Sequence, residues 1–294
     1  MSLNVLVLQA ENREVDYLGL TKRINPIMCD YLSKNTKNNY FFSFINMGLF
    51  CDYDESIELR SLPLKEGETN KMLLSDDLLE FTKINKIHPA TAKLFLMNWL
   101  LSRCQSVNED ISLFLQNGEN KKEFDFIVFL DSDAWIQTPD YLNTLIETLS
   151  NDETKNGAFS RDPYLSRNTY INSGSYVIKN NNFIRNMFCE LIETIKEDKS
   201  HLAVWAYDQY YISGWVFKNR DLFHVFKPNV LNTPCGFILR HNWFKTYKLY
   251  RDLYELLDAS YVIREPQIPF HYEEFIDRED FPNVMTYAYE WNEP

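Results

Sequence analysis

The feature that most constrains this chain is the mostly apolar run FDFIVFL at 124–130, which ends directly in Asp131-Ser132-Asp133. Continuous apolarity over this length is typical of a strand buried on both faces of an α/β sheet. Ligands of open α/β sheets bind beyond the carboxyl ends of the strands. Two carboxylates placed there are hard oxygen ligands for Mg²⁺ or Mn²⁺, and phosphate oxygens can complete the coordination. The segment therefore predicts a metal site at Asp131 and Asp133; the alternative is that polar residues merely end the strand.

The rest of the chain alternates between strand and helix patterns. Further strands are predicted at 4–8, 40–46, 157–160 and 175–178. Helices are predicted from His88, from Thr138-Pro139, over 183–195, and over 207–215 with an end at or near Gly214. We interpret 52–80 as irregular or poorly packed, and no linker rich in Pro, Gly or Ser divides the chain. Alternating strands and helices favour an α/β fold with a mixed, mostly parallel sheet flanked by helices. We expect a single domain over 1–294.

Charge and hydropathy narrow the possible partners and compartments. The net charge of −12 argues against nucleic acid or an anionic membrane as partner, because phosphates select basic surfaces. The N-terminus has no signal-peptide pattern. The longest charge-free apolar run lies between Lys93 and Arg103, well short of the ~20 residues of a membrane span. Five widely spaced cysteines without a Cys-x-x-Cys pair argue against a zinc site or a disulfide framework. We expect a soluble, cytoplasmic protein.

Several short motifs follow one another in an order that resembles a known family. They are HPATAK at 88–93, DSDA at 131–134, INSGS at 171–175, YDQ at 207–209 and, more weakly, LRH at 239–241. The sequence resembles the GT-A class of glycosyltransferases, in which Asp-x-Asp follows a buried strand. More closely, it is similar to the galactosyl-, mannosyl- and xylosyltransferase family of yeast and plant Golgi enzymes. The resemblance covers roughly residues 85–245, and the order and spacing of the motifs carry it.

The resemblance implies a set of metal and donor ligands. Asp131 and Asp133 would hold Mn²⁺ or Mg²⁺, with His241 as third ligand and His271 as second choice for that role. The nucleotide-sugar donor would contact Gln9, Ala10, Arg13, Lys93, Asp131, Ser132, Asn172, Gly174 and Gln209. The nucleotide and metal half would span about 1–135 and the acceptor half about 136–294.

Each of these residues also has an ordinary structural interpretation. Lys93 would neutralise donor phosphate, unless it is a solvated helix lysine. Gly174, which lacks a Cβ, would let the backbone approach the sugar closely, unless Asn172 and Gly174 form a simple turn. Arg13 is otherwise a surface arginine, and a lone histidine is often structural.

Asp208 is the predicted catalytic residue. A carboxylate beside the anomeric carbon stabilises an oxocarbenium-like transition state. In an inverting enzyme Asp208 would be the general base for the acceptor hydroxyl, and in a retaining enzyme it would be the stabiliser or nucleophile. Both outcomes stay open, as does the alternative that Asp208 caps a helix or pairs with a cation.

The resemblance also implies the substrates. It points to a UDP-sugar donor, with xylose, galactose and glucose open and xylose as first guess, and to a glycan acceptor. Two departures put the family's own substrate in doubt. Asn242-Trp243 stand where a glycine-cysteine pair often follows the late histidine, and the family's N-terminal membrane anchor is missing. A form without an anchor suits a cytosolic enzyme of a microbe or a large DNA virus.

Two rival functions remain. A phosphohydrolase of the haloacid-dehalogenase type also places Asp-x-Asp after a strand, but Trp135 stands where that family has Thr or Val. A non-catalytic carbohydrate-binding protein is the other rival. Metal-dependent binding of a nucleotide sugar would separate both rivals from the transferase.

Overall fold

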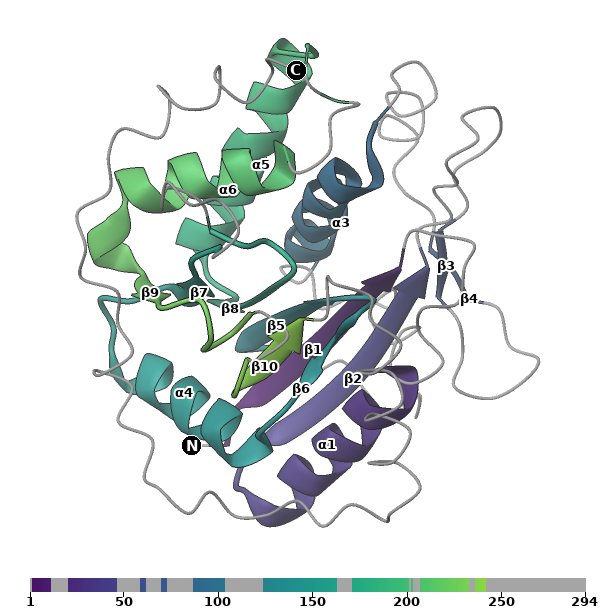
Figure 1. The fold of residues 1–294 in the computed structure, drawn as a ribbon, viewed down its shortest axis with the longest axis vertical. Helices are drawn as coiled ribbons and strands as arrows, with labels where there is room; N and C mark the ends of the chain where they lie inside the picture. Colours follow the sequence, from purple (N-terminus) through teal and green to yellow (C-terminus); the bar gives the residue numbers. More distant parts are fainter. Residues whose placement is uncertain are drawn as a thin grey trace.

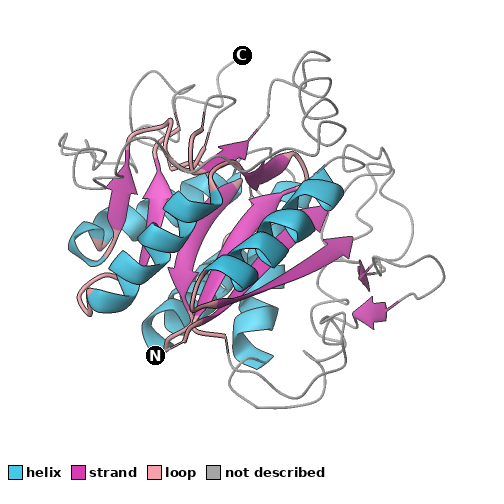
Figure 2. Cartoon of the chain, turned by 90° about the horizontal axis from the view of Figure 1, so that it is seen from below, coloured by secondary structure: helices cyan, strands magenta, loops and turns pink. Residues whose placement is uncertain are grey.

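The computed structural model describes residues 2–11, 21–46, 59–61, 70–72, 87–103, 124–162, 171–200, 202, 207–232 and 236–241. Figure 1 shows a central sheet with helices on both faces, and Figure 2 shows helices running alongside the strands.

The main sheet has the strand order β4-β3-β2-β1-β5-β8-β7-β9. Its strands are β1 (Asn4–Glu11), β2 (Asn39–Asn46), β3 (Leu59–Ser61), β4 (Asn70–Met72), β5 (Phe126–Asp131), β7 (Gly157–Ser160), β8 (Ser175–Lys179) and β9 (His224–Phe226). The long strands β2, β1 and β5 are parallel, and β7 is parallel to β9. Because β3 and β8 pair antiparallel with both of their neighbours, they run against the other six described strands. This confirms the predicted mixed, mostly parallel α/β sheet.

Helices cover both faces of this sheet. They are α1 (Thr21–Asn35), α3 (Pro89–Arg103), α4 (Pro139–Asn151), α5 (Asn182–Glu197), α6 (Tyr207–Lys218) and the short 3-10 helix η2 (Arg220–Leu222). Helices α3, α5 and α6 contact one another on one face, and α1 contacts α4 on the other. None of the described helices is both long and apolar enough to span a membrane.

Two buried cores follow from the alternation of side chains along the central strands. Leu6 and Leu8 of β1 pack in the core beneath α3, α5 and α6, whereas Val5 and Val7 pack in the core beneath α1 and α4. Successive side chains of a strand point to opposite faces, so a strand with a core on each side must be apolar throughout. The same reasoning explains the continuous apolar run of β5.

A small second sheet lies at the carboxyl end of β5. The strand β6 (Ala134–Ile136) follows β5 after a two-residue turn and pairs antiparallel with β10 (Leu239–His241). In this register His241 lies opposite Ala134. The second sheet therefore brings a residue from late in the chain to the turn that carries the two aspartates.

Some sequence predictions need correction. Helix α6 does not end near Gly214 but continues to Lys218. Glycine keeps its backbone N–H and C=O groups, so Gly214 does not interrupt the hydrogen bonds of the helix. Two short strands, β3 and β4, lie inside 52–80, which we expected to be irregular. Helix α1 and strands β6, β9 and β10 were not predicted. The single-domain organisation stays a prediction, since 242–294 lie outside the described residues.

Candidate active site and metal centre

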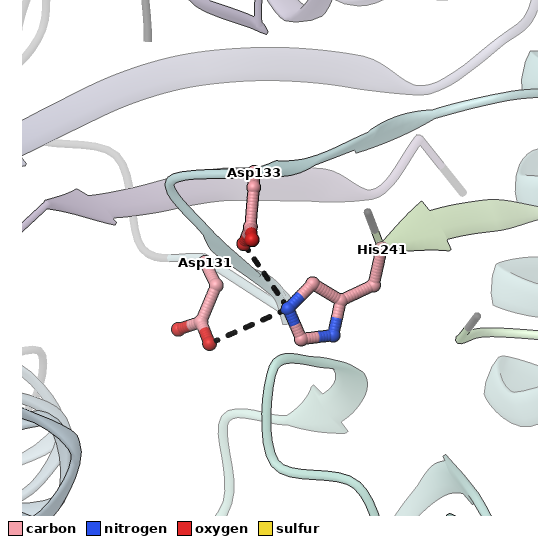
Figure 3. A group of neighbouring side chains, drawn as sticks. All are labelled: Asp131, Asp133 and His241. Atoms are coloured by element: carbon pink, nitrogen blue, oxygen red, sulfur yellow. Dashed lines mark ion pairs between the residues drawn. The ribbon is translucent and has the colours of Figure 1, made fainter. Parts of the chain in front are cut away.

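Asp131, Asp133 and His241 form a compact group of possible metal ligands (Figure 3). One donor atom from each lies within 4.8 Å of the others. The Nε2 atom of His241 is 3.1 Å from Oδ1 of Asp133 and 3.8 Å from Oδ2 of Asp131. Asp131 ends β5, Asp133 lies in the turn before β6, and His241 ends β10. The structure thus brings these three side chains together, and their role as metal ligands stays a prediction.

The opposite nitrogen of the His241 ring is held by two amide oxygens. Its Nδ1 lies 3.1 Å from Oδ1 of Asn172 and 3.0 Å from Oδ1 of Asn232. Amide oxygens only accept hydrogen bonds, so Nδ1 must carry the ring proton. In the neutral ring that a metal ion would bind, the lone pair then lies on Nε2, which faces the two aspartates. Metal-bound histidines are commonly oriented in this way through their second nitrogen. Without the ion, burial lowers the pKa of the His241 imidazole, but the carboxylates of Asp133 and Asp131 outweigh it and raise the pKa above its usual value.

The orientation of the Asn172 amide is itself fixed. Its Oδ1 accepts the backbone N–H of Gly174 at 2.8 Å, and its Nδ2 donates to Oδ2 of Asp162 at 3.0 Å. Because a carboxylate accepts and a backbone N–H donates, the amide cannot be turned over without losing both bonds. The side chains of Asp162 and Asn172 therefore set the tautomer of His241.

Gly174 makes room for the imidazole ring. A Cβ added there would lie 2.8 Å from Nε2 of His241 and closer still to Cε1 and Nδ1. The backbone oxygen of Gly174 also accepts the N–H of Asp131 at 2.7 Å. The predicted contact of Gly174 with a donor sugar stays a prediction. In the structure its missing side chain accommodates His241.

We expect Gly174→Ala to displace the imidazole ring and weaken Mn²⁺ binding by at least ~10-fold, because misplaced ligands bind a metal poorly. The overlap should also lower the free energy of unfolding by about 1–3 kcal/mol. The matched control is Gly214→Ala in α6, where a Cβ meets no atom within 4 Å. Alanine there should stabilise the helix by up to about 1 kcal/mol and leave Mn²⁺ binding unchanged. Calorimetric Mn²⁺ titration and urea unfolding measure both effects. Equal Mn²⁺ affinity in the two variants would contradict the proposed contact.

Lys93 of α3 joins the metal group to Asp208. Its Nζ lies 2.9 Å from each carboxylate oxygen of Asp131 and 3.2 Å from Oδ2 of Asp208. The side chains of Lys93 and Asp208 are 8% and 2% exposed. Burial alone would lower the pKa of Lys93, but the carboxylates of Asp131 and Asp208 outweigh it and raise the pKa above its usual value. Lys93 is therefore a buried cation and not a solvated helix lysine.

Asp208 lies in the first turn of helix α6 and faces this cluster. Its Oδ2 accepts a hydrogen bond from the hydroxyl of Ser173 as well as the contact from Lys93. Its Oδ1 is buried and has no hydrogen-bond partner among the described residues. The neighbouring Gln209 accepts the backbone N–H of Ser173 at 3.2 Å through Oε1. Pairing with a cation, the alternative raised for Asp208, thus occurs, and one carboxylate oxygen remains available.

The remaining predicted donor residues occupy different positions. Gln9 is fully buried beneath the Asp131–Asp133 turn, Ala10 lies opposite Asp131 in the β1–β5 register, and Ser132 is half-buried in the turn. Arg13 and His271 lie outside the described residues. Sequence reasoning missed Asp162, Asn232, Ser173 and Asn25, whose roles depend on contacts with other elements and loops that no local pattern shows.

The ligand atoms of Asp131, Asp133 and His241 suit a divalent cation. The two carboxylates suit Mg²⁺ or Mn²⁺, and the imidazole nitrogen is a ligand more typical of transition metals than of Mg²⁺. Burial raises the pKa of the Asp131 carboxyl despite the nearby Lys93 and His241. A bound cation would favour the charged carboxylate and offset this effect. The residues present therefore fit a metal ion held by Asp131, Asp133 and Nε2 of His241.

No protein-family model matches the sequence, and no curated protein is significantly similar to it. Among solved structures, the chain is similar to a glycosyltransferase involved in the glycosylation of the major capsid of PBCV-1, at 14% identity and a TM-score of 0.45, over 85% of this chain and 98% of that one. It is similar to mouse xyloside xylosyltransferase 1 at 13% identity and a TM-score of 0.47, over 82% and 98% of the two chains. It is similar to the galactosyltransferase LgtC at 12% identity and a TM-score of 0.46, over 92% and 99%. Similarity at this level assigns no activity, so the function must be argued from the site.

Proposed function

We propose that the protein is a metal-dependent glycosyltransferase that moves a sugar from a UDP-sugar to a glycan hydroxyl. The observation that carries the proposal is the convergence of Asp131, Asp133 and His241 beside a buried Lys93–Asp208 pair. This cluster lies at the carboxyl end of β5, the edge of an α/β sheet where ligands bind.

Asp131, Asp133 and His241 would hold Mn²⁺ or Mg²⁺. Three protein ligands leave coordination positions for the oxygens of a diphosphate. When bound, the ion acts as a Lewis acid that stabilises the charge of the departing nucleotide diphosphate. An acidic chain can thereby bind a phosphorylated donor.

Lys93 and Asp208 would act on the organic part of the reaction. Lys93 holds the carboxylates of Asp131 and Asp208 in fixed positions from one ammonium group. The unpartnered Oδ1 of Asp208 would take the proton of the acceptor hydroxyl in an inverting reaction. In a retaining reaction the same carboxylate would stabilise positive charge at the anomeric carbon. In both the inverting and the retaining reaction, Asp208 would carry the chemical step.

The family resemblance over residues 85–245 supports UDP as the nucleotide and a glycan as the acceptor. It favours xylose first, with galactose and glucose as alternatives. Asn242-Trp243 follow His241 in place of the glycine-cysteine pair that is frequent in the Golgi family. The sugar therefore has to be identified by experiment.

The test is a thermal-shift screen of UDP-, GDP- and CMP-sugars, each with Mn²⁺ and with EDTA. We expect UDP-sugars to raise the melting temperature only when Mn²⁺ is present, because a ligand stabilises the folded state that binds it. A response to no nucleotide sugar would refute the proposal. Phosphatase substrates and a glycan array would then test the phosphohydrolase and carbohydrate-binding rivals.

A further inference from the structure

The turn that carries Asp131 and Asp133 rests on two buried side-chain amides. Gln9 of β1 and Asn25 of α1 are both fully buried. The Nε2 group of Gln9 donates to the backbone oxygens of Asp131, Ser132 and Ala134, each at 3.2 Å. The backbone of the turn is therefore held from below by one side chain from another strand.

Asn25 extends this contact. Its Nδ2 donates to Oε1 of Gln9 at 3.0 Å and to the backbone oxygen of Ala134 at 3.3 Å, and its Oδ1 accepts the N–H of Ile136 at 3.0 Å. Buried backbone groups that are not paired in a sheet need such partners. Together the two amides bond to four residues of the segment between Asp131 and Ile136, at both sides of Asp133.

We propose that Gln9 and Asn25 are positioning residues that preorganise the metal centre by fixing the backbone of the Asp131–Asp133 turn. The two aspartates are one residue apart, so the direction of each carboxylate depends on the local backbone. A turn that is free to relax must be ordered again when the metal binds, which weakens binding. Neither side chain needs to touch metal or substrate.

This inference rests on the proposed function, because it assumes that the turn binds a metal. It assigns the side chain of Gln9 to the turn and not to the donor. It also gives helix α1, on the opposite side of the sheet from α3, a direct connection to the metal ligands.

The test compares Mn²⁺ affinity and metal-free stability in matched variants. Gln9→Met keeps the length of the side chain but removes its hydrogen-bond donors. We expect it to raise the Kd for Mn²⁺ by about 10- to 100-fold, because losing the groups that support metal ligands weakens metal binding by this amount. Asn38→Leu is the control. Asn38 is another buried amide, bonded to the N–H of Leu3 and to Asn143 and not to the turn. Asn38→Leu should lower the melting temperature in EDTA and leave the Mn²⁺ Kd unchanged.

If Gln9→Met does not fold, Asn25→Leu takes its place. Leucine is close to asparagine in size and adds no charge near the metal, but it removes the donor to Gln9 and the acceptor for the N–H of Ile136, so the Mn²⁺ Kd should again rise. Wild-type Mn²⁺ affinity in the folded variant would overturn the inference while leaving the proposed function intact. Failure of the wild-type protein to bind Mn²⁺ would overturn both.

Discussion

Lys93→Met is expected to lower the free energy of unfolding of the metal-free protein by about 3–5 kcal/mol. Methionine fills most of the space of the lysine stem but leaves the carboxylates of Asp131 and Asp208 close together without their shared cation. Removing one partner of a buried ion pair costs far more than the pair itself contributes, because the remaining charge is neither solvated nor paired. Urea unfolding in EDTA measures the loss.

Adding Mn²⁺ should restore part of the stability of Lys93→Met, because a divalent cation supplies positive charge beside Asp131. The control is Lys34→Met. Lys34 pairs with Asp30 on the surface, where both side chains are mostly exposed, and such a pair contributes less than about 1 kcal/mol. Comparable losses in the two lysine variants would show that Lys93 does not neutralise a buried site.

Asp208→Asn is expected to reduce the rate of sugar transfer by about 10²–10⁴-fold while leaving Mn²⁺-dependent donor binding nearly unchanged. Asparagine is the same size and still accepts the hydroxyl of Ser173, but it neither removes a proton nor stabilises positive charge as a carboxylate does. The metal ligands Asp131, Asp133 and His241 are not altered. Transfer of labelled sugar and calorimetric binding of UDP-sugar give the two readouts.

Asp30→Asn serves as the matched control for Asp208→Asn, since it makes the same substitution at an exposed carboxylate of α1. It should leave both transfer and donor binding unaltered. Full transfer activity in Asp208→Asn would remove Asp208 from the mechanism. A parallel loss of donor binding would mean that Asp208 positions the donor and does not act in the chemical step.

The central strands and the aspartate pair were predictable because their signals are local. A strand with a core on each side is apolar throughout, and the run before Asp131 shows this directly in the sequence. The strand and its carboxyl end are enough to predict that Asp131 and Asp133 lie at the edge of the sheet where ligands bind. The same holds for α4, whose start is marked by Pro139, and for α5, whose cap Asn181 accepts the N–H of Ile184.

Helix α1 was harder to predict. Pro26 lies inside it, and an interior proline removes a helix hydrogen bond and argues against a helix. The buried Asn25 beside it also interrupts the apolar pattern, although the structure shows that this amide bonds to Gln9 and the turn. A polar residue that serves a distant segment looks like a surface residue in the sequence.

The polar network around His241 depends on pairings that no local pattern reveals. The strands β6 and β10 have three residues each, and their register alone places His241 beside Asp133. Asn172 and Asn232 reach Nδ1 of His241 from two other segments. His241 was predicted through the family resemblance, whereas Asn232 carried no signal that distinguishes it from an ordinary loop asparagine.

Calorimetric titration of Mn²⁺ into the wild-type protein and Asp133→Ala, each with and without UDP, tests the central claim most directly. We predict that the wild-type protein binds Mn²⁺ and binds UDP only in its presence. Asp133→Ala should keep its fold by circular dichroism and lose both interactions, because it removes a carboxylate 3.1 Å from Nε2 of His241. Wild-type affinity for Mn²⁺ and UDP in Asp133→Ala would contradict the assignment of the metal centre.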